Sequence, residues 1–118
     1  MRKDDFLRKI EKPWTMDGCV YSFLRRVTEN YYVFEQVTPS GGLHYELVEP
    51  VRSGNGGRYP VSEEWGAHGH TFSGSEANMW AHIRRLVRAE KAVGRVRALP
   101  ESMRYPDVPV LGIPDEYK

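Results

Sequence analysis

The chain has 118 residues, of which 40% are hydrophobic and 28% charged, and its formal net charge is +1. Aromatic residues make up 12% of it, which excludes a wholly disordered chain. A net charge near zero excludes global electrostatic attraction to nucleic acid or to an anionic membrane. The single cysteine, Cys19, cannot form an internal disulfide and suits a reducing compartment. The sequence contains no membrane-length apolar run and no signal-peptide core, so we expect a cytoplasmic protein with no membrane partner.

The first half of the chain predicts a short helix followed by three strands. Asp4 or Asp5 can cap a helix that ends before Pro13. The strand-like stretches are residues 19–28, 31–38 and 43–51, which are rich in aromatic and β-branched residues. Turn signals at 29–30 and in the Pro-Ser-Gly-Gly run at 39–42 separate them. Short turns between successive strands predict an antiparallel meander.

The middle of the chain predicts a loop and one further strand. Residues 52–58 read Arg-Ser-Gly-Asn-Gly-Gly-Arg and indicate a flexible hairpin tip or loop. Residues 59–61 predict an edge segment, because Pro60 has no amide hydrogen to donate to a central ladder. Residues 62–69 are irregular, and residues 70–72 predict a short strand before the next helix.

Residues 73–97 predict a long amphipathic helix. Ser73 and Glu76 have the spacing of a capping box. We expect its apolar face to close one face of the sheet; that face holds Met79, Ile83, Leu86, Val87 and Val93. A basic stripe lies on the opposite side; its members are Arg84, Arg88, Lys91 and Arg95.

Together these elements predict an α+β fold. It comprises a three- to four-stranded antiparallel meander packed against one long C-terminal helix, a short N-terminal helix and a Pro-rich C-terminal arm. We expect one domain over residues 1–99 and an acidic arm over residues 100–118, laid on the surface or partly disordered. Residues 76–97 carry six Lys or Arg and two Glu, whereas residues 101–118 carry four Asp or Glu and two Lys or Arg. The arm can therefore fold back and neutralise the basic stripe.

The candidate metal ligands are three histidines, His44, His68 and His70, to which Glu63 or Glu64 can add a carboxylate. Alternate residues of a strand share a face, so the His-x-His pair can present two imidazoles to one ion. Two histidines that flank a glycine are more often solvent-facing loop residues. We therefore predict no metal and no other cofactor.

Residues that carry covalent catalysis occur without a diagnostic motif. Cys19 can act as a nucleophile beside a histidine, but its apolar neighbours favour a small buried residue. Glu63 and Glu64 on a polar loop are typical of solvated carboxylates. The chain contains no Gly-x-Ser-x-Gly, Walker-type or Cys-x-x-Cys motif. We expect no enzyme.

The basic stripe is the one extended signal for a binding surface. Its spacing suits phosphates along a groove, and Arg25 and Arg26 can extend it. A solvated helix face is the alternative, but such faces usually mix charges, and Glu90 is the only acid between Arg84 and Arg97. The residues expected to bind DNA or RNA, or an acidic protein surface, are Arg84, Arg85, Arg88, Lys91, Arg95, Arg52 and Arg58.

The predicted function is that of a small non-enzymatic binding or accessory protein that contacts nucleic acid through this helix face. The alternative is a protein-interaction module, or an inhibitor of a host factor, that uses the stripe or the Pro-rich arm. Stacking on single-stranded bases would need exposed aromatic residues beside the stripe. We instead expect Trp65, Phe72 and Trp80 to belong to the core.

One resemblance covers about residues 31–90. Its central part precedes a helix and reads Tyr59-Pro60-x-x-Glu63-Glu64-Trp65-Gly66-x-x-Gly69-x-Thr71-Phe72. With the upstream segments at 32–36 and 44–47, it resembles a pattern in small uncharacterised proteins of bacterial prophages and mobile elements. The resemblance implies an accessory protein of a mobile element and no activity or site residue. The order of elements is also similar to double-stranded-RNA-binding domains, although Glu76, Ala77 and Asn78 stand where their last helix begins with lysines.

Overall fold

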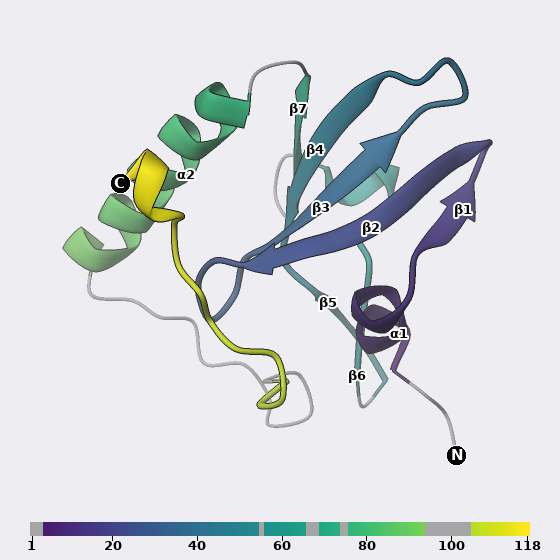
Figure 1. Cartoon of the computed structure of the whole chain (residues 1–118). Coiled ribbons are helices and arrows are strands. Elements are labelled where there is room, and N and C mark those ends of the chain that lie inside the picture. The colour runs from purple at the N-terminus through teal and green to yellow at the C-terminus, as the bar shows by residue number, and fades with distance from the viewer. Residues whose placement is uncertain (1–3, 55, 66–68, 74–75, 94–104) are drawn as a thin grey trace.

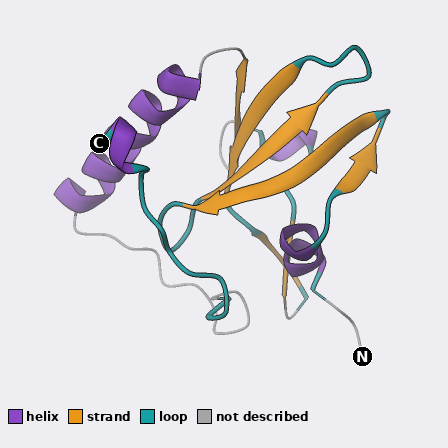
Figure 2. Cartoon of the chain, viewed as in Figure 1, coloured by secondary structure: helices purple, strands orange, loops and turns teal. Residues whose placement is uncertain are grey.

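The computed structural model describes residues 4–54, 56–65, 69–73, 76–93 and 105–118, with the backbone alone at 62 and 90–93. Its fold is α+β, with one five-stranded antiparallel sheet between helices (Figures 1 and 2). The sheet order is β1-β2-β3-β4-β7, and β5 and β6 form a separate hairpin. The elements are α1 (Asp5–Glu11), β1 (Trp14–Met16), β2 (Cys19–Arg26), β3 (Tyr32–Val37), β4 (Leu43–Val48), β5 (Val51–Ser53), β6 (Gly56–Arg58), η1 (Ser62–Glu64), β7 (Gly69–Ser73), α2 (Glu76–Val93) and η3 (Asp115–Tyr117).

Side-chain alternation in β3 explains how one sheet carries two cores. Tyr32, Val33 and Phe34 are all fully buried, although successive side chains of a strand point to opposite faces. Paired residues share a face, so Phe34 lies beside Glu46 of β4, whereas Val33 lies beside Leu47. We call the side of Phe34 the α1 face and the side of Val33 the α2 face.

Phe6 of α1 is the centre of the α1-face core. Its ring meets Tyr32 edge-on at 4.9 Å and stacks on Tyr105 at 5.7 Å. Asp4 caps α1, and its carboxylate also joins the helix to two distant segments. Its donors are the N–H of Leu7 at 3.0 Å, the N–H of Gly57 at 2.9 Å and the hydroxyl of Tyr105 at 2.9 Å.

The glycine-rich run at 52–58 packs tightly as the β5–β6 hairpin. A Cβ atom added to Gly56 would lie 2.5 Å from the Asp4 carboxylate, and one on Gly57 would lie 2.5 Å from the Tyr105 hydroxyl. These glycines therefore permit close approach of the backbone. The expected edge segment at 59–61 is instead a loop that leads to η1 and buries Tyr59 and Pro60.

The α2 face is covered by α2 through the apolar residues expected from the sequence. Met79 and Ile83 are fully buried, and Leu86 packs against them. Trp80 stacks on Tyr117 of η3, with ring centroids 6.0 Å apart. Residues 105–118, here called the C-terminal segment, thus complete this core (Figure 1).

Two arginines of β2 fix the path of the C-terminal segment. Arg26 is 2% exposed and donates hydrogen bonds to the carbonyl oxygens of Tyr105 at 3.0 Å and Val108 at 2.8 Å. Arg25 donates from Nε to the carbonyl of Gly112 at 2.6 Å. The suggestion that Arg26 extends a basic surface is therefore wrong, because this side chain is buried. Arg25 is half-buried, and its guanidinium group binds backbone carbonyls of the C-terminal segment.

The sheet has five strands, where the sequence predicted three or four. The short strand at 70–72 is confirmed as β7, which pairs with β4. The prediction omitted β1, which Asp17 and Gly18 connect to β2 with positive φ angles of 54° and 79°. An Asp-Gly pair favours such a tight hairpin turn.

The long helix differs from its prediction at its first residues, and its predicted last residues lie outside the described part of the chain. Ser73 belongs to β7, where its hydroxyl contacts Nδ1 of His44 at 2.9 Å, so the predicted capping box is wrong. The described part of α2 ends at Val93, and the stretch at 94–104 lies outside the described residues. The helix is not the last element, because the chain returns to the sheet from Tyr105 onward. No helix in the described ranges combines the length and apolar character needed to cross a membrane.

Candidate functional site

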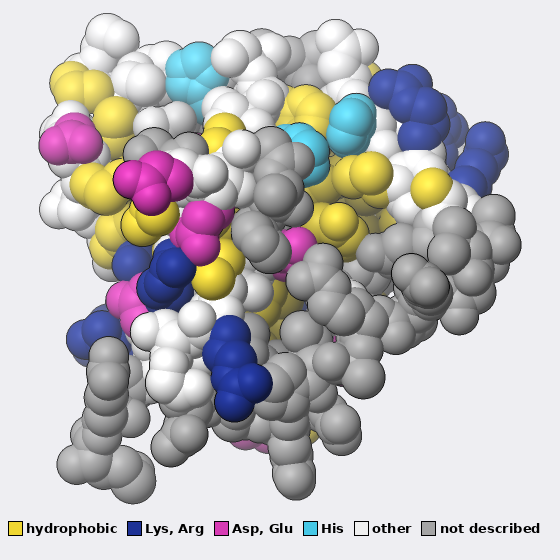
Figure 3. All heavy atoms as spheres, turned by 180° about the vertical axis from the view of Figure 1, so that it is seen from behind, with side chains coloured by type: hydrophobic (Ala, Val, Ile, Leu, Met, Phe, Trp, Pro, Cys, Tyr) yellow, Lys and Arg dark blue, Asp and Glu magenta, His cyan; other side chains and the backbone are white. Residues whose placement is uncertain are grey.

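Three of the predicted binding residues lie together on the outer side of α2. Arg85 and Arg88 are exposed and Arg84 is half-buried. Among the described residues, no acid forms an ion pair with any of these three arginines. Figure 3, in which α2 lies on the right, shows Lys and Arg side chains gathered at that edge. Lys91 continues the helix without a described side chain, and Arg95 lies outside the described residues.

Arg52 and Arg58 do not join this surface. They belong to the β5–β6 hairpin, which packs on the α1 face, whereas α2 covers the opposite face. Arg58 makes a bidentate ion pair with Glu64, at 2.6 and 2.8 Å, which raises the pKa of the guanidinium. Arg52 is exposed. The structure therefore brings together only part of the predicted set.

The C-terminal segment contacts α2 at Trp80, but within the described residues it forms no ion pair with the three arginines. Its Asp115 pairs with Lys118 at 3.0 Å, which lowers the pKa of the carboxyl group. Within the described parts of the chain, none of its acids pairs with Arg84, Arg85 or Arg88. The acidic segment and the basic helix face are neighbours without a direct charge contact in these ranges.

Two histidines border the arginines where β7 meets α2. The ring of His82 lies 5.7 Å from that of His70 and 5.1 Å from that of Phe72. Burial lowers the pKa of His82, and the neighbouring His70 and Arg85 lower it further. Among the described residues, Nε2 of His82 is buried without a hydrogen-bond partner.

The histidines considered as metal ligands do not assemble in the part of the chain that is described. His70 pairs with Leu47 and therefore lies on the α2 face. His44 precedes Leu47 by three residues in β4, so its side chain lies on the opposite, α1 face. His68 lies outside the described residues. No group of three or more His, Cys, Asp or Glu side chains suited to a metal occurs among those described.

A second candidate site, which we call the aromatic groove, lies on the α1 face. It has a volume of about 760 Å³ and is lined by residues of α1, β1 to β4, β7 and the 59–65 loop. Trp14 and Tyr21 stack at 4.8 Å, Tyr59 contacts Trp14 edge-to-face at 5.1 Å, and Trp65 lies 6.4 Å from Tyr59. Trp65 is held by a hydrogen bond of 2.9 Å from its Nε1 to the hydroxyl of Thr71.

Glu46 places a buried carboxyl group at this groove. Its side chain is 6% exposed, and one of its oxygens accepts a hydrogen bond from the hydroxyl of Tyr59. Burial raises the pKa of Glu46, and burial and Glu46 together raise the pKa of Tyr59. Beside them, the Gln36 amide donates to the hydroxyl of Tyr21 at 3.0 Å. The groove thus combines aromatic surfaces with polar groups at a fixed geometry.

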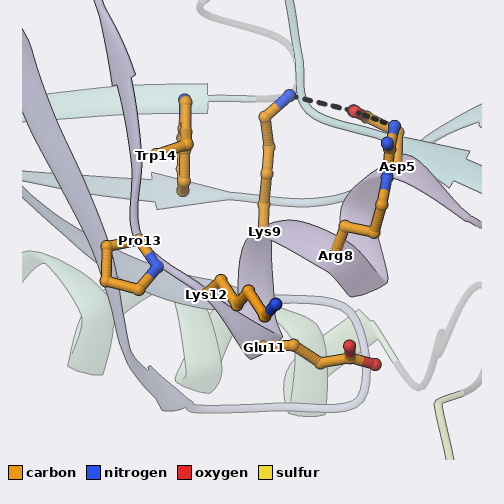
Figure 4. Close-up of a pocket in the computed structure, with 7 residues that line it drawn as sticks. All are labelled: Asp5, Arg8, Lys9, Glu11, Lys12, Pro13 and Trp14. Carbon is orange, nitrogen blue, oxygen red and sulfur yellow. Dashed lines mark hydrogen bonds and ion pairs between the residues drawn. The ribbon is translucent and has the colours of Figure 1, made fainter.

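Lys9 and Trp14 separate the groove from a smaller hollow of about 420 Å³ along α1 (Figure 4). The figure shows the Lys9 side chain standing beside the Trp14 ring, with its amino group directed at Asp5. The distance from Nζ of Lys9 to the Asp5 carboxylate is 3.1 Å. Burial acts to raise the pKa of Asp5, but Lys9 acts to lower it, and the pKa is lowered overall. Both hollows therefore share one wall.

No protein-family model, curated protein or solved structure matches the chain. The chain is therefore classified by its architecture, as an α+β domain with a five-stranded antiparallel sheet.

Sequence reasoning missed the aromatic groove because its lining comes from seven separate segments. The sequence assigned Trp65 to the core, and in the structure this side chain both packs against the α1-face core and lines the groove. One local signal was available. Glu46 interrupts a strand whose neighbours Tyr45, Leu47 and Val48 are all buried, and a carboxyl group in such a position is uncommon without a partner.

Proposed function

We propose that the chain is a non-enzymatic binding protein that contacts the phosphate backbone of DNA or RNA through the outer side of α2. The observation that carries the proposal is the grouping of Arg84, Arg85 and Arg88 without a described acidic partner. A solvated face of mixed charge would hold such arginines in ion pairs along the helix. Unpaired guanidinium groups are available to phosphate oxygens, which they bind in a bidentate manner.

A further feature supports a polyanion as the ligand, because the spacing of the arginines continues in the sequence through Lys91 and Arg95. A membership among accessory proteins of prophages or mobile elements is part of the same proposal and rests on the resemblance at residues 31–90 alone.

The test is charge reversal of the three arginines together, Arg84→Glu, Arg85→Glu and Arg88→Glu, with binding to duplex DNA and to single-stranded RNA followed by fluorescence anisotropy across a salt series. For a duplex, each lost phosphate contact reduces the slope of log affinity against log salt by about 0.9, so we expect a slope smaller by about 2 to 3. The matched control reverses three exposed cations on the other side of the sheet, Arg8, Lys12 and Arg52, and changes net charge equally. The control keeps the wild-type slope if α2 is the contact.

Equal loss of affinity in the two variants would show a response to net charge and would contradict the α2 interface. Absence of binding to both nucleic acids at low salt would overturn the proposal. An acidic protein surface is the alternative partner for the same arginines. A complex that is lost in the α2 variant but survives nuclease treatment would replace nucleic acid with that partner.

A further inference from the structure

We propose that the aromatic groove on the α1 face binds an organic cation, an ammonium group on an apolar frame, with Glu46 as its counter-charge. The groove and the basic side of α2 lie on opposite faces of the sheet, so this inference is independent of nucleic-acid binding.

The rings of the groove form one connected set that hydrogen bonds and packing hold in place. Trp14 and Tyr21 are paired in register on β1 and β2 and are nearly parallel, with 10° between their planes. Tyr59 contacts Trp14 edge-to-face, with ring centroids 5.1 Å apart, and Trp65 lies next to Tyr59 at 6.4 Å. Trp65 is fixed through its hydrogen bond to Thr71. These rings make up an aromatic wall of the groove, and the electron-rich face of such a ring attracts a cation.

Glu46 supplies a charge that the protein itself leaves uncompensated within the described residues. No Lys or Arg among them forms an ion pair with it, and its one hydrogen bond comes from Tyr59. Burial of an ionised carboxylate without a cation is costly, and this is why its pKa is raised. A bound ammonium ion would supply the missing charge and draw the group into its ionised form.

Lys9 shows that this environment accommodates a cation. Its Nζ lies 5.4 Å from the ring centre of Trp14 and 5.9 Å from that of Tyr59. Asp5 neutralises it with both carboxylate oxygens at 3.1 Å. Lys9 therefore occupies one end of the groove in a balanced pair, which leaves Glu46 and the exposed Asp17 as the remaining charges of the lining.

Size and charge together select the ligand class. A volume of about 760 Å³ accepts an apolar frame as well as an ammonium group. An anionic ligand would meet Glu46 and Asp17 and would be repelled. The same ammonium chemistry occurs in free small amines and in the lysine side chain of a peptide, and the experiment separates these two sources.

The experiment measures binding of benzyltrimethylammonium to the full chain by the fluorescence of the groove tryptophans and by calorimetry. Benzyl alcohol, which has the same ring without the charge, is the ligand control. We expect the cation to bind at least tenfold more tightly than the alcohol and Glu46→Gln to reduce its affinity at least tenfold. Glu35→Gln is the matched variant, because Glu35 pairs with Tyr45 on the α2 face, and it should bind as the wild type does.

The pH dependence gives a second readout with a defined sign. The ionised form of Glu46 binds the cation, so affinity should rise as pH increases through the raised pKa of this group and then level off. The other titratable groups that act on Glu46 are His44 on the same strand, Tyr59 from the adjoining loop and Tyr21 from β2. Neither tyrosine ionises in this range, and protonated His44 would favour the carboxylate, so Glu46→Gln should remove the rise.

Equal binding of benzyl alcohol and the cation would overturn the inference, and so would unchanged affinity in Glu46→Gln. Trp65→Leu provides an independent check, since it should weaken binding of the cation while leaving the Glu46 charge in place. A blocked lysine peptide that competes with benzyltrimethylammonium supports a peptide as the natural source. Binding of the small cation without such competition supports a free amine.

Discussion

At the scale of single residues, Arg26 joins β2 to the C-terminal segment through its buried guanidinium group. Besides the carbonyls of Tyr105 and Val108, it donates a hydrogen bond to the carbonyl of Glu29 at 2.7 Å. It also lies over the ring of Tyr32, 5.0 Å from the ring centroid. One planar cation thus satisfies three backbone acceptors that belong to two separate parts of the chain. Such a geometry requires arginine, because a lysine ammonium cannot span the same set of acceptors.

Replacement Arg26→Met should therefore destabilise the protein by about 2–5 kcal/mol. The physical reason is that buried carbonyl groups lose charged donors while the methionine restores only part of the packing. Urea denaturation measures the effect as a lower midpoint at an unchanged slope. Arg8→Met, at an exposed position of α1, is the control and should stay within about 0.5 kcal/mol of the wild type. A midpoint for Arg26→Met equal to that of the control would show that Arg26 does not anchor the segment.

At the scale of elements, α1 depends on its attachments. A helix of seven residues is marginal in water by itself, so its persistence comes from the contacts around it. Asp4 provides the N-cap and, through the same carboxylate, binds the β5–β6 hairpin and the C-terminal segment. The hairpin in turn needs Gly56 and Gly57 in order to approach this carboxylate and the Tyr105 hydroxyl.

For Asp4→Ala we expect a loss of about 2–4 kcal/mol, because the cap and two further hydrogen bonds disappear together. Thermal unfolding followed by far-ultraviolet circular dichroism measures this loss. Asp107→Ala is the matched control, since Asp107 is exposed in a turn of the C-terminal segment. If both alanine variants unfolded at the same temperature, the attachment of α1 through Asp4 would be refuted.

At the scale of the whole molecule, a single sheet separates two hydrophobic cores that share the strands β3 and β4. The α1-face core contains Phe6, and the α2-face core contains Ile83. β3 has buried side chains on both faces, so neither core can lose its packing while the other keeps an intact sheet. We expect both cores to unfold in one cooperative transition.

Ile83→Val tests this coupling with a mild change of about 0.5–1.5 kcal/mol. The single-tryptophan variants that keep only Trp80, on the α2 face, or only Trp14, on the α1 face, report the two cores separately. Ile83→Val should shift both fluorescence transitions to the same lower midpoint. A shift confined to the Trp80 signal would mean that the two cores unfold independently.

The local signals in the sequence were sufficient for α1, for the three-stranded meander and for the apolar face of α2. Each of these depends on patterns within one segment, such as the Asp4 cap or the period of Met79 and Ile83. Arg25 and Arg26 could not be placed in this way, because their acceptors in the C-terminal segment lie about 80 residues away in the chain. The aromatic groove escaped prediction for the same reason, since its walls meet only after the sheet has formed. Its carboxyl group at Glu46 was visible in the sequence, but its burial was not.

The hydrogen bond between Asp4 and Tyr105 affects when the α1-face core can form during synthesis. The two residues are 101 positions apart, and the ring of Tyr105 also packs on Phe6. During synthesis, α1 leaves the ribosome early but must wait for Tyr105 before its hydrogen bonds and its aromatic neighbours are complete. The α1-face core is therefore finished only after nearly the whole chain has emerged. Until then, the nascent chain presents Phe6 and its partners in the sheet to chaperones and to other chains.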